Sequence, residues 1–291
     1  MILQALKEYY DRKAADPDSD IAPEGFEKKE IPFLVIIKPD GEFVNLRPMR
    51  EKKDNVTIRK IYLLPRSEKR TGSRSFEKTF LLWDHIGYLF GFPDSDPRAA
   101  KQHQTWLNSL EKLPDELKQD EGVKAILLFY QNGGVSAVKG HPSWSECLKI
   151  PSCNMTFCLV EDEVPIPCRS AVREYVRSTM QKPISHQEKD KHYSGVFAHC
   201  LIKGNYGEIK RTHQYTPIDK DAKSLVSFQK NSGYDSYGKE QCYNAPVSES
   251  AEFAYTTGLN TLLKSKGQRI KVGDAVTVYW SEKASSLEKD A

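Results

Sequence analysis

The residues with the clearest capacity for chemistry are the basic side chains between Arg47 and Lys78. This segment holds eleven lysines and arginines against four aspartates and glutamates, a net charge of +7, whereas the whole chain carries +3. Positive side chains at this density suit contacts with phosphate groups. Residues 66–75 are polar and include a glycine, which lets the backbone approach a ligand closely. The candidate DNA-binding residues of this loop are Arg66, Lys69, Arg70, Thr71, Gly72, Ser73 and Arg74.

The alternative for this loop is a solvated surface segment, because charged runs commonly do no more than face water. The residues offer no apolar anchor that would hold them in place. An adjoining predicted hairpin can hold the loop rigidly, and its Gly-Ser tip favours close contact with a ligand. Both interpretations stay open at the level of sequence.

A second group of polar and aromatic residues precedes a predicted helix. Lys239 and Gln241 are the second pair of candidate DNA-binding residues, and Tyr237 or Tyr243 can stack on an opened base. The simpler interpretation is a tight turn that leads into a core helix. Ser248 is predicted to cap that helix, acidic residues favour its N-terminal end, and apolar residues recur on one face.

The sequence lacks the usual signatures of catalysis. It contains no Gly-x-Ser-x-Gly, Walker, His-Glu-x-x-His or EF-hand motif. His199 and Cys200 are adjacent on a predicted strand, so their side chains point to opposite faces and do not form a dyad. None of the cysteines forms a Cys-x-x-Cys pair, which favours scattered reduced thiols over a zinc site. We therefore expect a non-catalytic protein with no metal and no cofactor.

Composition sets the broad class. The 291 residues are 38% hydrophobic and 29% charged, as in a soluble globular protein of one large or two smaller domains. No apolar run approaches membrane-spanning length, and residues 1–20 lack a signal core. We expect a cytoplasmic protein that does not contact a membrane.

Hydrophobic periodicity predicts an α+β fold, with mixed antiparallel sheets and several packed helices. Helices are expected over residues 3–14, 80–90, 97–110, 170–176 and 249–263, with one or two further elements over 114–130. Strands are expected over residues 33–37, 43–46, 57–64, 154–160, 195–202, 224–228 and 275–279.

Three stretches near the C-terminal end resemble a known family. Ser236 to Gln241, Asn244 to Ser248 and Phe253 to Asn260 are similar to the signature of the large subunit of type I-C CRISPR surveillance (Cascade) complexes. The opening Met1 to Leu6 resembles that family's start. The run from Lys69 to Gly72 followed by Phe80 to Asp84 is similar to the family as well.

This resemblance implies a non-catalytic subunit at one end of an RNA-guided antiviral complex. Such a subunit senses the motif that flanks the target in double-stranded DNA, helps to open the duplex, and helps to recruit a helicase-nuclease. Its partners would be the DNA target and a guide-RNA complex with backbone and end-capping subunits. Guide pairing reads the sequence, while the protein reads the flank.

The resemblance also implies an organisation. Residues 1–280 would be the N-terminal region of the large subunit, with a subdomain boundary near 135–150, followed by a polar tail over 281–291. The helical-bundle domain with which the family continues is absent from this sequence. A general nucleic-acid-binding or scaffold module that contacts RNA or protein partners is the alternative function.

Overall fold

The computed structural model describes residues 1–53, 56–70, 72–181, 196–218, 223–229, 238–283 and 285. The chain forms two compact units. The first combines Met1–Glu24 with Pro183–Ala291, and the second is Gly25–Lys182. Residues 135–150, where a boundary was expected, lie inside the second unit.

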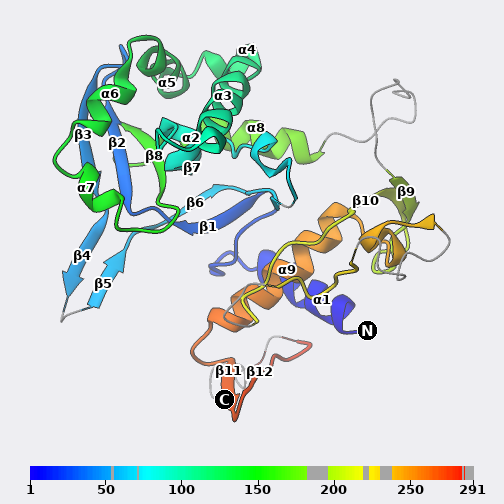
Figure 1. The fold of residues 1–291 in the computed structure, drawn as a ribbon. Coiled ribbons are helices and arrows are strands. Elements are labelled where there is room, and N and C mark those ends of the chain that lie inside the picture. Colours follow the sequence, from blue (N-terminus) through cyan, green and yellow to red (C-terminus); the bar gives the residue numbers. More distant parts are fainter. Residues whose placement is uncertain are drawn as a thin grey trace. The chain divides into compact units, whose positions relative to one another are not determined.

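The second unit is built on a four-stranded sheet with the order β3-β2-β8-β7 (Figure 1). β2 runs antiparallel to β3 and parallel to β8, and β7 runs antiparallel to β8. These strands are β2 (Phe33–Ile37), β3 (Phe43–Pro48), β7 (Trp83–His85) and β8 (Asn154–Leu159). The α+β class expected from the sequence is confirmed.

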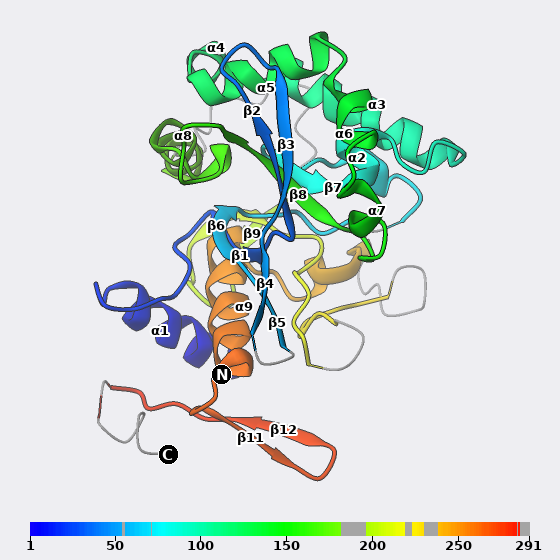
Figure 2. The ribbon, with the colours of Figure 1, turned by 90° about the vertical axis from the view of Figure 1, so that its left-hand side faces the viewer.

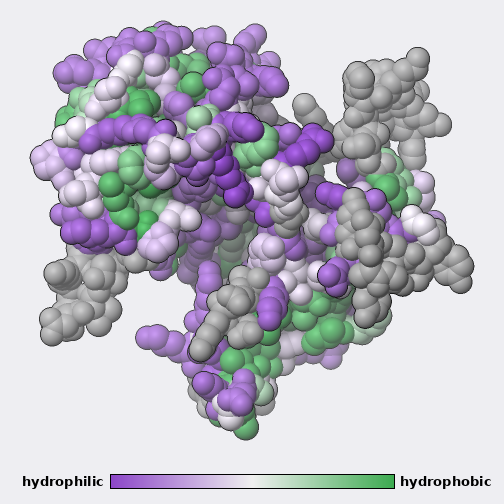
Figure 3. Space-filling view, viewed as in Figure 1, coloured by the Kyte–Doolittle hydropathy of each residue, from purple (hydrophilic) through white to green (hydrophobic). Residues whose placement is uncertain are grey.

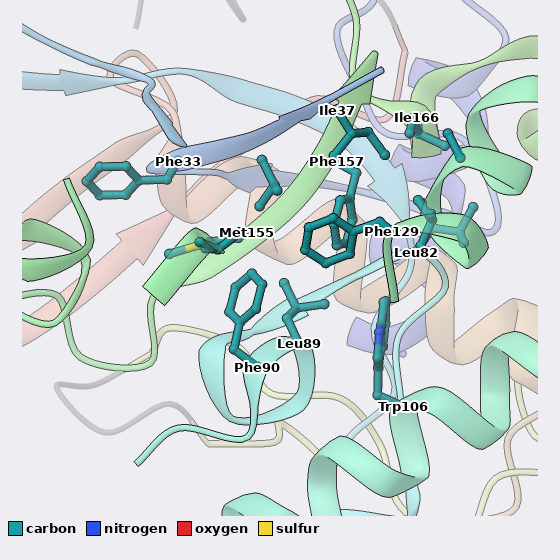
Figure 4. Packing of buried hydrophobic residues seen from close by; sticks show 14 of the residues in the cluster. Phe33, Ile37, Leu82, Leu89, Phe90, Trp106, Phe129, Met155, Phe157 and Ile166 are labelled. Carbon is teal, nitrogen blue, oxygen red and sulfur yellow. The ribbon is translucent and has the colours of Figure 1, made fainter. Parts of the chain in front are cut away.

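The central strand β2 is buried on both faces. Phe33, Val35 and Ile37 face one hydrophobic cluster, whereas Leu34 and Ile36 face another. Both faces of a strand must be apolar when both are covered, which explains five consecutive apolar residues. Figure 4 shows the first cluster, in which β2 and β8 contribute Phe33, Ile37, Met155 and Phe157, and the helical side contributes Leu89, Trp106 and Phe129.

Helices cover one face of this sheet, and short strands lie against the other. The β2–β3 hairpin packs closely on α5, because a Cβ at Gly41 would lie 2.4 Å from the backbone nitrogen of Phe129. The helices are α2 (Ile86–Phe90), α3 (Pro97–Glu111), α4 (Asp115–Lys118), α5 (Glu121–Gln131), α6 (Gly134–Lys139), α7 (Trp144–Cys147) and α8 (Ser170–Gln181). Single 3-10 turns are η1 (Ser75–Glu77) and η2 (Ile166–Cys168), and two further strand pairs are β1 (Phe26–Glu30) with β6 (Ile61–Pro65) and β4 (Arg50–Lys53) with β5 (Val56–Arg59).

The first unit is organised by α1 (Ile2–Ala14) packed on α9 (Glu249–Lys264), as Figure 2 shows. Leu6, Tyr9, Tyr255 and Leu262 are among the buried residues that join the two helices. The remaining elements are the hairpin β9 (Val196–His199) with β10 (Tyr206–Ile209), the turn η4 (Gln241–Asn244), and the hairpin β11 (Arg269–Val272) with β12 (Ala275–Val278).

The predicted helix over residues 80–90 is wrong in its first half. The chain turns at Leu82, which has a φ of 62°, and Trp83–His85 then forms β7 against β8. The carbonyl of Leu82 accepts a hydrogen bond from Thr156 Oγ1 at 2.7 Å. Only Ile86–Phe90 is helical, so pairing with β8 overrides the helical periodicity of the apolar residues.

Other boundaries also differ from expectation. The predicted strand over residues 57–64 is two strands, because β5 pairs with β4 whereas β6 pairs with β1. Within the described residues 223–229, Lys223 forms a single bridge to Thr216 in place of the strand expected over 224–228. The strand expected over 195–202 ends at His199, where the chain turns back into β10.

The surface of the molecule is largely polar. Hydrophilic residues predominate on the face that Figure 3 shows, and hydrophobic residues appear there in small groups. In the parts of the chain that the structure describes, no helix is both long and apolar enough to cross a membrane.

Gly258 gives the first testable prediction. A Cβ at this position in α9 would lie 2.8 Å from the carbonyl oxygen of Leu6 in α1. Gly258→Val should therefore lower the free energy of unfolding by about 1–3 kcal/mol through overpacking, although a side chain normally favours a helix over glycine. Chemical denaturation followed by circular dichroism measures the change.

The matched control is Gly267→Ala, at a position where an added Cβ meets no atom within 4 Å. Equal stability of the two variants would contradict close packing of α1 on α9.

Candidate nucleic-acid interface

The basic loop, defined here as residues 66–78, connects β6 to the segment before β7. Its first residues are fixed by the start of the second unit. The backbone nitrogen of Arg66 donates to the carbonyl of Gly25 at 2.9 Å, and that of Ser67 donates to Glu27 Oε1 at 2.8 Å. Thr71 lies outside the described residues.

Arg70 anchors the loop to the sheet. Its Nη1 donates to Asp84 Oδ1 at 2.9 Å, its Nη2 donates to Asp84 Oδ2, and its Nε donates to the carbonyl of Lys78 at 2.9 Å. The guanidinium carbon lies 3.6 Å from the ring centroid of Phe80 and 3.9 Å from that of Tyr88. The Arg70 side chain is 16% exposed and that of Asp84 is 0% exposed. The loop thus has an anchor that its lack of apolar residues concealed.

Asp84 is held by backbone amides as well as by the guanidinium. The amides of Phe80 and His85 donate to its carboxylate at 3.2 and 2.9 Å. Burial raises the pKa of Asp84, whereas the hydrogen bonds and charge of Arg70 and the two amides act in the opposite direction. The carboxylate therefore depends on Arg70 to remain charged inside the unit.

The tip of the loop is open. Gly72 has a φ of 77°, a conformation that favours glycine, and a Cβ there would meet no atom within 4 Å. Ser73 is exposed, and the side chain of Arg74 is 81% exposed. Arg74 forms an ion pair with Glu77, and Lys78 forms one with Glu68 at 2.8 Å. Arg66 and Lys69 are partly exposed.

A hollow of about 460 Å³ lies between the loop tip and the first turn of α3. The loop supplies Gly72, Ser73 and Phe76. The helix supplies two cations one turn apart, Arg98 and Lys101, together with Asp96 and Pro97. The sequence analysis missed Phe76, Arg98 and Lys101, although the Asp96-Pro97 helix start already places both cations in the first turn.

The second predicted group lies in the other unit. Lys239 is exposed, and Gln241 has a φ of 47°, which is uncommon for a residue other than glycine. Asn244 Nδ2 donates to the carbonyls of Lys239 and Gln241, each at 2.9 Å, and so holds this turn. Tyr243 is half-buried in η4. Tyr237 lies outside the described residues.

Buried polar groups on α9 position the chain beneath this turn. Glu252, 1% exposed, accepts a hydrogen bond from the backbone nitrogen of Gln214 at 2.8 Å. His213 Nδ1 lies 2.6 Å from the hydroxyl oxygen of Tyr255. The carbonyl of Arg211 accepts from the backbone nitrogen of Cys242 at 3.0 Å. The signature segments thus meet through α9, and the role expected for Glu252 at the helix N-terminus is replaced by a buried contact.

Ser248 occupies the N-cap position of α9 as predicted, but its side chain makes no capping bond. Its hydroxyl lies 3.4 Å from Cys200 Sγ, which is 2% exposed. The ring of His199 faces the carbonyl of Gly204 instead, with Nδ1 at 3.1 Å. In the described ranges, no group of three or more His, Cys, Asp or Glu side chains is placed to hold a metal ion.

Comparison with known proteins follows from these features. The model of the Cas_Csd1 family, described as CRISPR-associated protein, matches residues 6–291. The chain belongs to this family of CRISPR-associated proteins. A search of curated proteins gave no match.

The Arg70–Asp84 pair gives the second testable prediction. Arg70→Gln should lower the free energy of unfolding by about 3–5 kcal/mol, because it leaves a buried carboxylate without its partner. The pKa of Asp84 should then rise further, so the variant keeps Asp84 protonated where the unfolded chain ionises it. Stability is lost as pH rises through that window, so the deficit relative to wild type should be larger at pH 7.5 than at pH 5.

Urea unfolding at the two pH values measures this effect. The control is Arg70→Gln combined with Asp84→Asn, which removes the charge as well as its partner and should show a smaller deficit with little dependence on pH. A deficit in Arg70→Gln that is the same at both pH values would contradict the proposed dependence of Asp84 on Arg70.

Proposed function

We propose that this chain is a non-catalytic DNA-binding subunit of an RNA-guided antiviral complex, of the type I-C kind that its signature resembles. In this role it senses the motif flanking the target in double-stranded DNA, helps to open the duplex, and helps to recruit a helicase-nuclease. Its partners are the guide-RNA complex, with backbone and end-capping subunits, and the DNA target. Family membership supports a place in a CRISPR system.

The observation that carries the DNA-binding part is the construction of the basic loop. Its base is fixed by the buried Arg70–Asp84 pair, whereas its tip exposes Gly72, Ser73 and Arg74. A rigid mount reduces the entropy that a binding loop loses when it meets its ligand. Exposed cations beside a glycine suit contacts with backbone phosphates.

Discrimination of the flank is assigned to the second group. Lys239 and Gln241 are polar side chains on a turn that Asn244 holds from within. Gln241 keeps a backbone conformation that costs free energy for a residue with a side chain, and such residues cluster at functional sites. An amide side chain in the minor groove separates A·T from G·C pairs.

The third testable prediction compares these two groups in the assembled complex. Arg74→Gln should weaken capture of duplex targets by a similar factor for every flanking motif and lower the log–log salt slope by about 1, as expected for a phosphate contact. Gln241→Ala should lower the preference for one flank over another and leave the salt slope nearly unchanged. Gel shifts with duplexes that differ only in the flanking motif measure both effects.

Lys124→Gln, which removes an exposed cation on α5, is the matched control and should bind as wild type. If the wild-type complex binds all flanks equally, the alternative of a general nucleic-acid-binding or scaffold module is favoured. We also expect no cleavage of nucleic acid by the chain when Mg²⁺ is added, and turnover abolished by a point substitution in the chain would contradict a non-catalytic role.

A further inference from the structure

The hollow beside the basic loop has the size and lining of a binding site. Its volume of about 460 Å³ falls within the range of roughly 300–1,000 Å³ that is typical of small-molecule pockets. One wall is the loop tip with Phe76, and the other is the first turn of α3 with Arg98 and Lys101. It therefore offers an aromatic surface and two positive charges to one ligand.

Arg98 is oriented before any ligand arrives. Its Nη2 donates to Ser75 Oγ at 2.8 Å, while the residue as a whole remains exposed. A guanidinium carries five N–H donors in a planar fork that matches a phosphate, and this contact uses one of them. Arg98 is thus directed along the wall of the hollow with further donors available.

Lys101 lies on the same face of α3, because residues three apart in a helix are neighbours. Its Nζ is 5.8 Å from the ring centroid of Phe76. This distance is within the range of a cation–π contact and places the ammonium group beside the aromatic wall. A phosphate held by Arg98 and Lys101 would therefore have an aromatic ring next to it.

The negative charge in the hollow is already engaged. Asp96 Oδ1 accepts a hydrogen bond from the backbone nitrogen of Arg98 at 2.8 Å and caps α3. This cap occupies a helix amide that would otherwise face a ligand, so an anion must be held by the two side chains. Burial and the charges of Arg70 and Arg98 lower the pKa of His85 to about 4, which agrees with a positive field on this side of the unit.

The two walls are tied together. Arg98 joins α3 to Ser75, and the hydroxyl of Tyr88 donates to the carbonyl of Ser75 at 3.1 Å. Tyr88 is also one of the rings that enclose Arg70. The clamp that fixes the loop therefore fixes the hollow, and the ligand meets a preformed site.

We infer that this hollow binds one unpaired nucleotide of a DNA strand, with its phosphate on Arg98 and Lys101 and its base on Phe76. This inference rests on the proposed function, because the loop that forms one wall is the proposed DNA-binding loop. A positive groove combined with an aromatic ring is the usual means of binding single-stranded nucleic acid. A base inside a duplex is stacked on its neighbours and does not expose its face to Phe76.

The test uses the full-length chain with a fluorescent single-stranded oligonucleotide and with a duplex of the same sequence. Arg98→Gln combined with Lys101→Gln should weaken single-strand binding by about tenfold and lower the log–log salt slope by roughly 1 to 2. Phe76→Leu, which keeps apolar volume but removes the ring, should weaken single-strand binding by about fivefold or more and change duplex binding little. Fluorescence anisotropy provides the affinities.

The matched control is Lys112→Gln, which neutralises an exposed cation at the other end of α3 and should bind as wild type. Thermal unfolding verifies that each variant is folded. A photo-crosslink from 5-iododeoxyuridine in the oligonucleotide should map to Phe76 in the wild-type chain and disappear in Phe76→Leu. These measurements locate the nucleotide independently of affinity.

Three outcomes would overturn the inference. They are absence of oligonucleotide binding by the wild-type chain, wild-type affinity of the Arg98/Lys101 double variant, and an effect of the cations without any effect or crosslink at Phe76. Failure of the proposed function is a separate result, because it shows in the assembled complex as equal binding of all flanking motifs.

Discussion

The second unit depends on one buried ion pair enclosed by aromatic rings. Arg70 brings a guanidinium from the loop, Asp84 brings a carboxylate from β7, and Phe80 and Tyr88 cover the two faces of the guanidinium. Asp84 has no exposed surface, so its charge requires the partner and the amides that surround it. A polar loop is attached to a hydrophobic sheet by this means, without any apolar residue of its own.

The sequence was informative where a segment's burial determines its composition. β2 has five apolar residues in succession because both its faces are covered, and α9 shows an apolar stripe because one face packs on α1. It misled where a partner distant in sequence decides the structure. Residues 80–90 have helical periodicity, yet β7 forms because β8 offers a free edge to Trp83–His85. No local pattern contains that information.

The same limit applies to the candidate site. Arg70 and Arg74 are indistinguishable as members of a basic run, but one is enclosed by two rings and the other is almost fully exposed. Glu252 reads as a favourable charge at a helix N-terminus, whereas the fold uses it as a buried acceptor for Gln214. Composition identified the correct segments, and only three-dimensional contacts separate the residues that hold the loop from those that face solvent.

This separation has an energetic consequence for binding. Arg74 pairs with Glu77 and Lys78 pairs with Glu68 at the surface, where such pairs contribute little and water replaces a lost partner. These cations can therefore exchange a carboxylate for a phosphate at small cost, and the pairs keep the loop ordered until they do. Arg70 cannot make that exchange, because its departure would leave the carboxylate of Asp84 unpaired in the interior. The loop is consequently divided into a base that cannot change partners and a tip that can, which is the arrangement that a preformed but reversible DNA contact requires.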